Sequence, residues 1–352
     1  MIKIILYYIN IFGESMNNIK NILSLYGLND AKISLIKYKS SEKERAVYKI
    51  KSTAHSYCLK QIYYSEEELL FVYSALEWLN SYNLNVTRFL KNSDSGRYIN
   101  YDGVLYILTD WIDGVKCDSN IESHLSYAIK EIAKFHLCSK DFLPIDKSLN
   151  RCRFTDLYIS TLKHIERLFE YKNKATKKND VFSKIFLNDF EQSIKLSEIS
   201  LKISALIKPK LLSKSLCHGD FVTRNILIKD TDVWFIDFDN CKYSYSAYDI
   251  SYFLRRILGR RNFDLNVNNI ISLLCDYNSV SLLGKDDLMY IVSYIIFPQK
   301  LFKISKHYYY DKKKISKKQC IDSIKRYSKG LKFRLDLAEK LVDYFEMKDW
   351  KM

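Results

Sequence analysis

The segment from residue 216 to residue 250, LCHGDFVTRNILIKDTDVWFIDFDNCKYSYSAYDI, constrains this chain more than any other part of its sequence. An apolar run of β type, Val233 to Ile236, ends directly on Asp237. A second short strand is predicted from Asn225 to Ile228, and the polar residues between the two, 229–232, are typical of a turn. The sequence therefore predicts a β-hairpin with an acidic residue at its end.

Three polar side chains are expected to meet at this hairpin. Asn225 and Asp237 would lie at neighbouring strand ends, and Asp220 lies on the loop just before the first strand. Carboxylate and amide oxygens suit Mg²⁺ with bound phosphate, and the additional carboxylate can take a proton from an attacking hydroxyl. The pattern His-x-Asp-x4-Asn, then a hairpin and an Asp after an apolar strand, is that of the catalytic and metal loops of kinases.

The alternative to this interpretation is a surface loop with scattered acids. At roughly 5% per residue type, three fixed residues at fixed spacing recur by chance about once in 10⁴ positions. The strand–turn–strand context that the pattern also requires lowers this chance rate further. The sequence therefore favours a functional site over a surface loop.

Length and composition indicate a compact, ordered and helix-rich protein. The chain has 352 residues, of which 47% are apolar, and it contains only 3 Pro and 9 Gly. This length allows one large two-lobed domain or two smaller domains. The eight Cys show no closely spaced pairs, so we expect reduced thiols in a cytosolic setting rather than a disulfide framework or a zinc site.

The chain is basic, with 56 Lys and Arg against 41 Asp and Glu and a formal charge of +15. Such a charge is compatible with a nucleic acid or an anionic surface as partner. The lysines are spread along the chain among many Ile, Asn and Tyr, which is also what a compositional bias of the genome produces. Because no nucleic-acid-binding motif accompanies the charge, we expect no nucleic-acid partner.

No segment of the sequence is long and apolar enough to span a bilayer, so no membrane partner is expected. The best candidate, residues 288–297, has only half of the ~20 residues that a span requires. Residues 1–15 contain a short apolar run without a signal cleavage site, and Met16 with the following Asn-Asn-Ile-Lys is typical of a chain start. We expect residues 1–15 to be an extension outside the fold.

Three short strands are predicted near the start of the fold, at residues 32–38, 46–51 and 57–62. In a kinase, the turn between the first two strands covers the phosphates of the nucleotide and is usually rich in glycine. Here that turn, residues 39–45, contains none, and no Gly occurs between Gly27 and Gly96. This absence counts against a protein kinase and leaves small-molecule kinases open.

Lys60 lies between apolar neighbours in the third of these strands. We predict that it contacts the α- and β-phosphates of a nucleotide, the alternative being a lysine on a solvated strand face. The next helix is predicted over residues 65–79, and its first turn carries Glu66, Glu67 and Glu68. One of these acids could pair with Lys60, although acids at a helix start also simply favour the helix dipole. Glu68 is our candidate for the pair.

A further hairpin is predicted from residue 97 to residue 109, and residues 110–114 follow it. A linker between two lobes is expected at this point of the chain. Its backbone could offer the carbonyl of Asp110 and the N–H of Ile112 to the edge of an adenine. This prediction rests on the order of the elements along the chain.

From residue 121 onward the pattern is almost entirely helical. His136 lies on the apolar stripe of a helix predicted over 125–137, so we expect it to be a buried structural histidine. Asp249 opens a helix that runs to about residue 258, where it could cap the helix and brace the catalytic loop by hydrogen bonds. Further helices are predicted within 154–207 and over 266–278, 285–308 and 316–347.

The order of these elements closely resembles the aminoglycoside and choline phosphotransferase branch of the kinase-like fold. Two features separate this branch from protein kinases: HGD replaces HRD, and Asp237 lies only twelve residues before Asp249, which leaves no room for an activation loop. The resemblance implies an α+β, bilobal, protein-kinase-like fold. Its parts would be a β-rich N-lobe, an interlobe hinge and a helical C-lobe, over residues 16–109, 110–114 and 115–352.

Within this branch the chain most closely resembles the CotS-type spore coat proteins of spore-forming bacteria, over about residues 17–345. The segments that carry this resemblance are Ser65-Glu-Glu-Glu-Leu-Leu-Phe, Asp110-Trp-Ile-Asp-Gly, Ile132-Ala-Lys-Phe-His, Leu216-Cys-His-Gly-Asp and Phe297-Pro-Gln-Lys-Leu-Phe-Lys-Ile with the following Tyr308-Tyr-Tyr. The resemblance implies cytoplasmic synthesis, assembly into the spore coat and other spore coat proteins as partners.

The resemblance also implies roles for single residues. Asp220 would be the catalytic base, Asn225 and Asp237 the Mg²⁺ ligands, and Asp239 an auxiliary acid of the metal site. The remaining roles concern ATP and the loop: Lys60 would hold the phosphates, Asp110 to Ile112 the adenine, and His218 would order the catalytic loop. In the wider branch the helix glutamate lies about one turn later, where this chain has Val72.

The expected reaction is in-line transfer of the γ-phosphate of ATP to a hydroxyl of a small-molecule acceptor. The acceptor should bind among the helices of residues 154–207 and 285–310. Because this region is basic, a neutral or anionic sugar or metabolite is expected rather than an aminoglycoside. The alternative function is that of a structural spore coat component with a kinase fold and little or no catalytic activity.

Overall fold

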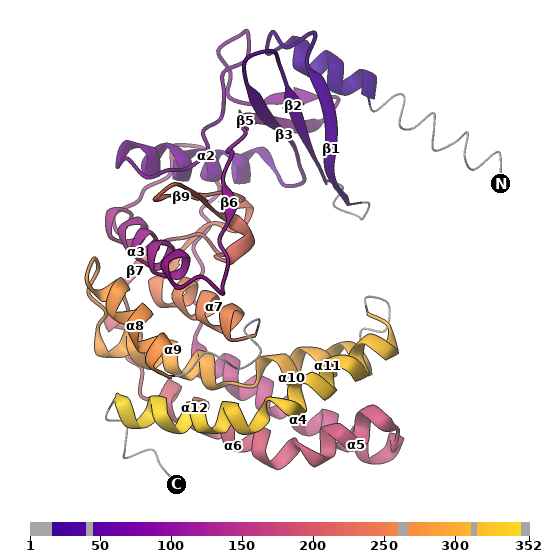
Figure 1. The fold of residues 1–352 in the computed structure, drawn as a ribbon, viewed down its shortest axis with the longest axis vertical. Helices are drawn as coiled ribbons and strands as arrows, with labels where there is room; N and C mark the ends of the chain where they lie inside the picture. The colour runs from indigo at the N-terminus through magenta and orange to yellow at the C-terminus, as the bar shows by residue number, and fades with distance from the viewer. Residues whose placement is uncertain (1–15, 40–44, 260–266, 311–314, 346–352) are drawn as a thin grey trace, which may run out of the picture. The chain divides into compact units, whose positions relative to one another are not determined.

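The computed structural model describes residues 16–39, 45–259, 267–310 and 315–345 (Figure 1). The predicted extension, residues 1–15, and the centre of the predicted phosphate-covering turn lie outside the described residues. The described chain divides into two compact units. The first contains residues up to 115 together with 143–151 and 227–236, and the second contains 116–142, 152–226 and the residues from 237 onward.

The first unit is built on an antiparallel five-stranded sheet of order β1-β2-β3-β5-β4. Its strands are β1 (Lys32–Lys39), β2 (Arg45–Lys51), β3 (Ser56–Ile62), β4 (Ile99–Tyr101) and β5 (Val104–Asp110). The three strands and the hairpin predicted from the sequence are therefore confirmed, with ends that differ by one or two residues. The α+β composition predicted for the whole chain is confirmed as well.

One face of this sheet carries the apolar core of the unit. Leu59 and Leu108 are almost fully buried there and pack with Ile22 and Leu23 of the helical segment 16–24. Successive side chains of a strand point to opposite faces, so the residue after Leu59 leaves from the other face. That residue is Lys60, which the strand register places between Val47 of β2 and Ile107 of β5.

Helix α2 (Glu66–Ser81) follows the third strand and buries Leu69, Val72, Leu76 and Leu79, as their helical spacing predicts. Two segments that are distant in sequence join this unit. Leu149 N–H donates to the carbonyl of Glu67 at 2.9 Å, and Phe235 N–H donates to the carbonyl of Asn85 at 3.0 Å. Because of these contacts, residues 143–151 and 227–236 group with the first unit, although the sequence placed both in the C-lobe.

The predicted hairpin is present as β8 (Ile226–Lys229) and β9 (Asp232–Phe235), with β6 (Val115–Lys116) beside β8 in a three-stranded sheet. Strand β8 begins one residue later than predicted. Thr223 to Asn225 form a 3₁₀ turn, so Asn225 lies just before the strand rather than in it. Asp230 in the turn has a positive φ of 57°, a conformation that Asp tolerates better than most residues.

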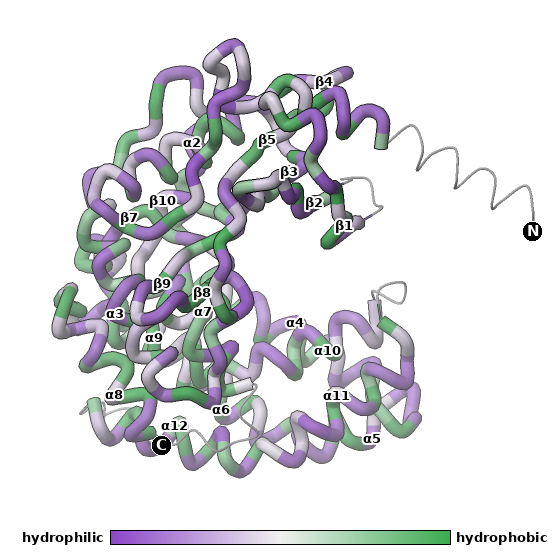
Figure 2. Tube along the Cα trace, turned by 45° about the horizontal axis from the view of Figure 1, so that its top comes forward, coloured by the Kyte–Doolittle hydropathy of each residue, from purple (hydrophilic) through white to green (hydrophobic). Residues whose placement is uncertain are grey.

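The second unit is mainly helical, with a small pair of antiparallel strands, β7 (Lys214–Cys217) and β10 (Lys242–Tyr245). Figure 2 shows hydrophilic and hydrophobic residues alternating along its helices, as expected for helices that pack by one face. The helices are α3 (Glu122–Cys138), α4 (Leu157–Lys178), α5 (Val181–Asn188), α6 (Phe190–Ala205), α7 (Ser246–Leu258), α8 (Val267–Asn278), α9 (Lys285–Ile296), α10 (Gln299–Tyr309), α11 (Lys317–Lys329) and α12 (Leu331–Tyr344).

Two long helices predicted from the sequence are each divided in the structure. The helix predicted over 285–308 is broken at Pro298, which separates α9 from α10. A proline disfavours the helical conformation of the residue before it, and Phe297 accordingly has an extended ψ of 131°. The helix predicted over 316–347 is divided at Gly330 into α11 and α12. None of the described helices is long and apolar enough to cross a membrane.

Candidate active site

The loop His218-Gly219-Asp220 follows β7 and is held against the turn after β9 by a close backbone approach. Gly219 has a positive φ of 78°, and a Cβ at this position would lie 2.1 Å from the carbonyl oxygen of Asn240. Only glycine allows the two backbones to come this close. The loop that carries Asp220 and the turn that carries Asp237 and Asp239 are therefore adjacent in the second unit.

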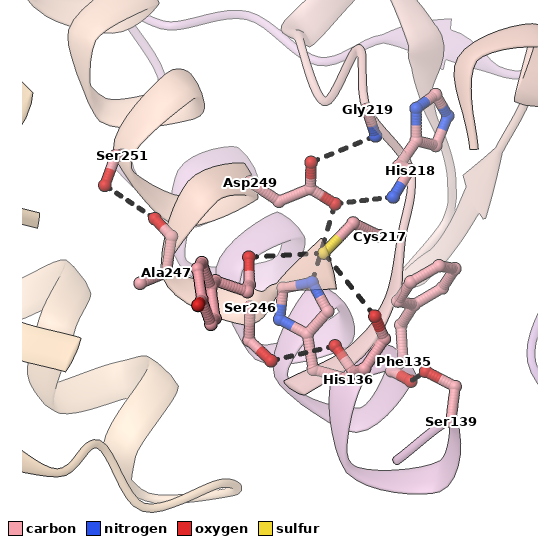
Figure 3. Close-up of polar contacts among 12 residues, drawn as sticks. Phe135, His136, Ser139, Cys217, His218, Gly219, Ser246, Ala247, Asp249 and Ser251 are labelled. Atoms are coloured by element: carbon pink, nitrogen blue, oxygen red, sulfur yellow. Dashed lines mark hydrogen bonds and ion pairs between the residues drawn. The ribbon is translucent and has the colours of Figure 1, made fainter. Parts of the chain in front are cut away.

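Asp249 holds the same loop from the other side. Its carboxylate accepts hydrogen bonds from the N–H of His218 at 2.5 Å and from the N–H of Gly219 at 3.0 Å. Figure 3 shows the carboxylate between these two nitrogens and the ring of His136, whose Nε2 lies 3.5 Å from Asp249 Oδ2. The predicted N-cap role is wrong, because α7 begins at Ser246 and has Tyr245 at its N-cap. Asp249 lies inside the first turn and braces the loop.

Asp249 is fully buried, yet it is held as an anion. Burial alone would raise its pKa. The neighbouring His136, the charge of His218 and the N–H of Gly219 outweigh burial, and the pKa of Asp249 lies below its ordinary value. His136 is itself buried, and its Nδ1 lies 2.9 Å from the hydroxyl of Tyr277, so it is a structural residue as predicted.

His218 is also buried and has contacts that order the loop. Its ring packs against Phe238, with 4.7 Å between ring centres. Its Nδ1 accepts a hydrogen bond from the N–H of Asp220 at 3.3 Å. These contacts join the catalytic loop to the residue that directly follows Asp237.

Asp220 and Asn225 meet directly. The side-chain nitrogen of Asn225 donates to the carbonyl oxygen of Asp220 at 2.9 Å and to its carboxylate Oδ2 at 3.2 Å. This orientation leaves the side-chain oxygen of Asn225, which is the atom that could bind a hard cation, turned away from the carboxylate. The structure thus brings together the residues predicted as base and metal ligand.

Two further residues contact Asp220 that the sequence reasoning missed. Arg224 Nη2 lies 2.5 Å from Asp220 Oδ2, and the hydroxyl of Tyr252 on α7 donates to Asp220 Oδ1 at 3.3 Å. The i,i+4 spacing from Asp220 to Arg224 was a local signal that could have indicated this pair. No comparable signal exists for Tyr252, which is 32 residues away.

The predicted metal-site acids, Asp237 and Asp239, both follow the end of β9 at Phe235. Asp237 adopts a left-handed conformation with φ 69° and ψ 60°, which is strained for a residue with a side chain. Asp239 follows in a 3₁₀ turn and is buried. The carboxylates of Asp237 and Asp239 and the side-chain oxygen of Asn225 are the donor types that a small divalent cation such as Mg²⁺ prefers, and their joint binding of such a cation stays a prediction.

In the first unit, Glu68 is engaged at the start of α2. Its Oε2 accepts from the N–H of Ser65 at 3.2 Å and completes a capping box, and its Oε1 lies 3.3 Å from Arg151 Nη2. The pair of Glu68 with Lys60 therefore stays a prediction. Val72, which occupies the position of the helix glutamate in the related branch, is buried in the core.

The predicted adenine contacts lie at the end of β5. Asp110 is the last residue of this strand, and Trp111 N–H donates to the carbonyl of Ser56 at 3.0 Å. Within the described ranges, the N–H of Ile112 has no protein acceptor. The backbone of this segment is thus able to donate to a ligand, and its contact with adenine stays a prediction.

Comparison with known proteins places this arrangement in a family. The family model described as "Phosphotransferase enzyme family" matches residues 38–271. The fold is similar to that of an aminoglycoside phosphotransferase from Alicyclobacillus acidocaldarius, with 17% identity over 93% of this chain and 96% of that chain and a TM-score of 0.75.

Two more solved structures share the fold. A spectinomycin phosphotransferase, in complex with ADP and spectinomycin, has 15% identity over 90% of this chain and 97% of that chain, with a TM-score of 0.63. The amicoumacin kinase hAmiN, in complex with AMP-PNP, Ca²⁺ and Ami, has 16% identity over 88% of each chain, with a TM-score of 0.58. Because the family model covers residues 38–271, which is more than half of the chain, this chain belongs to the phosphotransferase enzyme family.

Proposed function

We propose that this chain is an ATP-dependent phosphotransferase that transfers the γ-phosphate of ATP to a hydroxyl of a small molecule. The observation that carries the proposal is the contact of Asp220 with Asn225 on a loop that Asp249 and the close approach of Gly219 to Asn240 both hold in place. Positioning and electrostatics supply most of the acceleration in phosphoryl transfer, so a rigid loop of this kind is what the reaction requires.

In this reaction the acceptor oxygen forms a bond to the γ-phosphorus while the bond from that phosphorus to the β,γ-bridging oxygen breaks. The proton of the acceptor hydroxyl passes to the carboxylate of Asp220, and ADP leaves. Asn225 and Asp237, with Asp239 beside them, would hold Mg²⁺, which offsets the charge of the phosphates when bound. Lys60 would contact the phosphates, and the backbone of Asp110 to Ile112 the adenine.

Arg224 adds a cation at the same place. Its guanidinium lies against Asp220 Oδ2 and its side chain is 48% exposed, so it can reach a phosphoryl group that approaches the loop. Binding of nucleotide and divalent cation is supported by two fold relatives, one solved with AMP-PNP and Ca²⁺ and one with ADP.

The proposal is tested by the melting temperature of the purified protein with ATP, with and without Mg²⁺. A rise that depends on Mg²⁺ and disappears in Asp237→Asn is expected, together with loss of phosphate transfer. Asp232→Asn, in the same hairpin but exposed, is the matched control and should behave as the unchanged protein. Near-normal metal-dependent turnover of Asp237→Asn would refute the assignment.

We further propose that the protein is of the CotS type and is assembled into the spore coat after cytoplasmic synthesis, with other coat proteins as partners. Support comes from the five sequence segments quoted above, of which Phe297 to Ile304 begins at the break between α9 and α10. An antibody against the purified protein should label the coat fraction of spores. If millimolar ATP with Mg²⁺ leaves the melting temperature unchanged while the coat is labelled, the structural role without catalysis would replace the phosphotransferase.

A further inference from the structure

Two adjoining cavities lie in the second unit beside the proposed catalytic base. Their volumes are about 420 and 380 Å³, and they share part of their lining, including Tyr252, Arg255 and Lys303. Tyr252 donates a hydrogen bond to Asp220, so one residue of the shared wall touches the proposed base directly. Each cavity is large enough for a sugar-sized ligand.

Helix α7 connects the base to this wall. Asp249 braces the catalytic loop from its first turn, Tyr252 follows three residues later, and Arg255 three residues after that. Residues three apart in a helix are neighbours along one face. A ligand held by Arg255 would therefore lie along the same helix face that contacts Asp220.

The described residues that line the two cavities include many cations and no carboxylate. The smaller cavity has Arg153, Lys242, Arg255 and Lys303, and the larger adds Arg256, Lys300 and Arg334. A net charge of +15 alone would distribute cations around the surface. Several cations elsewhere in this unit have acidic partners: Lys172 lies 3.0 Å from Glu191, and Lys130 lies 3.0 Å from Asp276.

The cations of the smaller cavity lack such partners. Across the described part of the chain, Lys242 and Arg255 form no ion pair with a carboxylate, although both are half-buried. Burial lowers the pKa of Lys242, because removing an ammonium group from water has a cost that the nearby charge of Asp249 offsets only in part. A half-buried cation without a partner is a group whose charge is available to a ligand.

Tyrosine rings hold these cations in place. The Arg255 guanidinium lies 4.1 Å from the ring centre of Tyr294, and Lys242 Nζ lies 4.3 Å from that of Tyr248. Contact with the π-face orients a cation without neutralising it. The planar guanidinium remains able to donate two parallel hydrogen bonds to a phosphate or a carboxylate.

From these observations we infer that the acceptor is an anion: a small sugar or polyol that carries a phosphate or carboxylate group in addition to the hydroxyl that is phosphorylated. Arg255, Lys303 and Lys242 bind the anionic group, and the hydroxyl faces Asp220. This inference rests on the proposed function. An amine-bearing acceptor would require carboxylates in the wall, and the described lining of both cavities has none.

Binding is tested with four probes that share one sugar skeleton: glucose, gluconate, glucose 6-phosphate and glucosamine. Isothermal titration calorimetry in the presence of ADP and Mg²⁺ keeps the nucleotide site occupied. We expect the two anionic probes to bind at least tenfold more tightly than glucose, with glucosamine weakest. Their affinity should fall as salt rises, because exposed charges are screened. Equal affinities for all four, no binding of the anions, or preference for glucosamine would overturn the inference.

Substitutions of single residues test which side chains bind the anionic probes. Arg255→Gln and Lys303→Gln should each weaken binding of the anionic probes by about tenfold or more, since a hydrogen bond to a charged group contributes that much. Lys195→Gln, which removes one exposed positive charge from α6 in the same unit, is the control and should change nothing. Melting temperatures report whether each variant is folded. If Arg255→Gln and Lys303→Gln both bind the anions as Lys195→Gln does, the inference is wrong.

The same variants separate this inference from the proposed function. Arg255→Gln should retain the Mg²⁺-dependent shift with ATP, because its side chain is assigned to the acceptor and not to the nucleotide. If the unchanged protein binds ATP with Mg²⁺ but discriminates against the anionic probes, the inference of an anionic acceptor is wrong and the proposed phosphotransferase function is not affected. If the unchanged protein binds the anionic probes but not ATP, the proposed phosphotransferase function is wrong and the anion-binding site is still supported.

Discussion

Replacing Asp249 by Asn should destabilise the second unit and loosen the catalytic loop. The carboxylate accepts two hydrogen bonds, from the N–H groups of His218 and Gly219, and is fully buried. The side chain of Asn has one acceptor oxygen, so it can accept from only one of these two N–H groups and turns its own NH₂ group toward the other N–H. A hydrogen bond to a charged group contributes about 1.5–3 kcal/mol, so the expected loss is about 3 kcal/mol.

For a unit of 150–250 residues, 1 kcal/mol corresponds to about 2–4 °C in melting temperature. The variant should therefore melt about 6–12 °C lower than the unchanged protein at pH 7, as measured by calorimetry or circular dichroism. Asp336→Asn, at an exposed position of α12, is the control and should melt within about 1 °C of it. Phosphate transfer by Asp249→Asn, measured well below its melting temperature, should fall because Asp220 loses its fixed position.

The pH dependence gives this prediction a second check. The pKa of Asp249 is lowered in the folded protein, so its contribution is present above the unfolded value of 3.8 and is lost as the pH falls through the lower folded value. The difference in melting temperature should stay constant from pH 7 to pH 5 and shrink below 3.8. A variant that melts within about 1 °C of the unchanged protein at pH 7, or a difference that grows in acid, would refute the brace.

Other substitutions test neighbouring parts of the site. Gly219→Ala should destabilise by about 1–3 kcal/mol or more and abolish transfer, because its Cβ meets Asn240 and φ is positive; chemical denaturation measures the loss, and an unchanged midpoint would contradict the close approach. Asp220→Asn should lower turnover by about 10²–10⁴-fold with the ATP-dependent melting shift retained, and a loss of less than tenfold would exclude it as base. Glu68→Ala removes the capping box and should cost about 1 kcal/mol in denaturation; a larger than tenfold loss of transfer would instead indicate the pair with Lys60.

Local patterns in the sequence predicted much of the fold. The hairpin of β8 and β9 and the strands of the first sheet are set by runs of apolar residues and turn residues, and they are present. The break at Pro298 was readable in the same way, because a proline disfavours helix in the residue before it, but the apolar spacing on both sides predicted one continuous helix.

Contacts between distant residues could not be predicted in this way. Asp249 begins an apolar helical pattern, which is equally compatible with a cap and with a brace, and only the position of the loop 31 residues before it decides between them. The sequence around Glu68 is likewise compatible with a capping box and with an ion pair to Lys60, and the structure shows the capping box. Tyr252 has no local feature that points to Asp220. The cations of the smaller cavity come from separate parts of the chain, with Lys242 on β10, Arg255 on α7 and Lys303 on α10.

Helix α7 holds the proposed base in place from one end and contributes to the proposed acceptor site from the other. Its first turn fixes the loop that carries the base, and its last turn supplies Arg255 to the cavity wall. We expect a substitution at Arg255 to change which acceptor is held without displacing Asp249. The structures that share this fold include a spectinomycin phosphotransferase and the amicoumacin kinase hAmiN. We expect that, on one rigid helix of this kind, acceptor preference can change by single substitutions while the residues proposed for phosphate transfer keep their places.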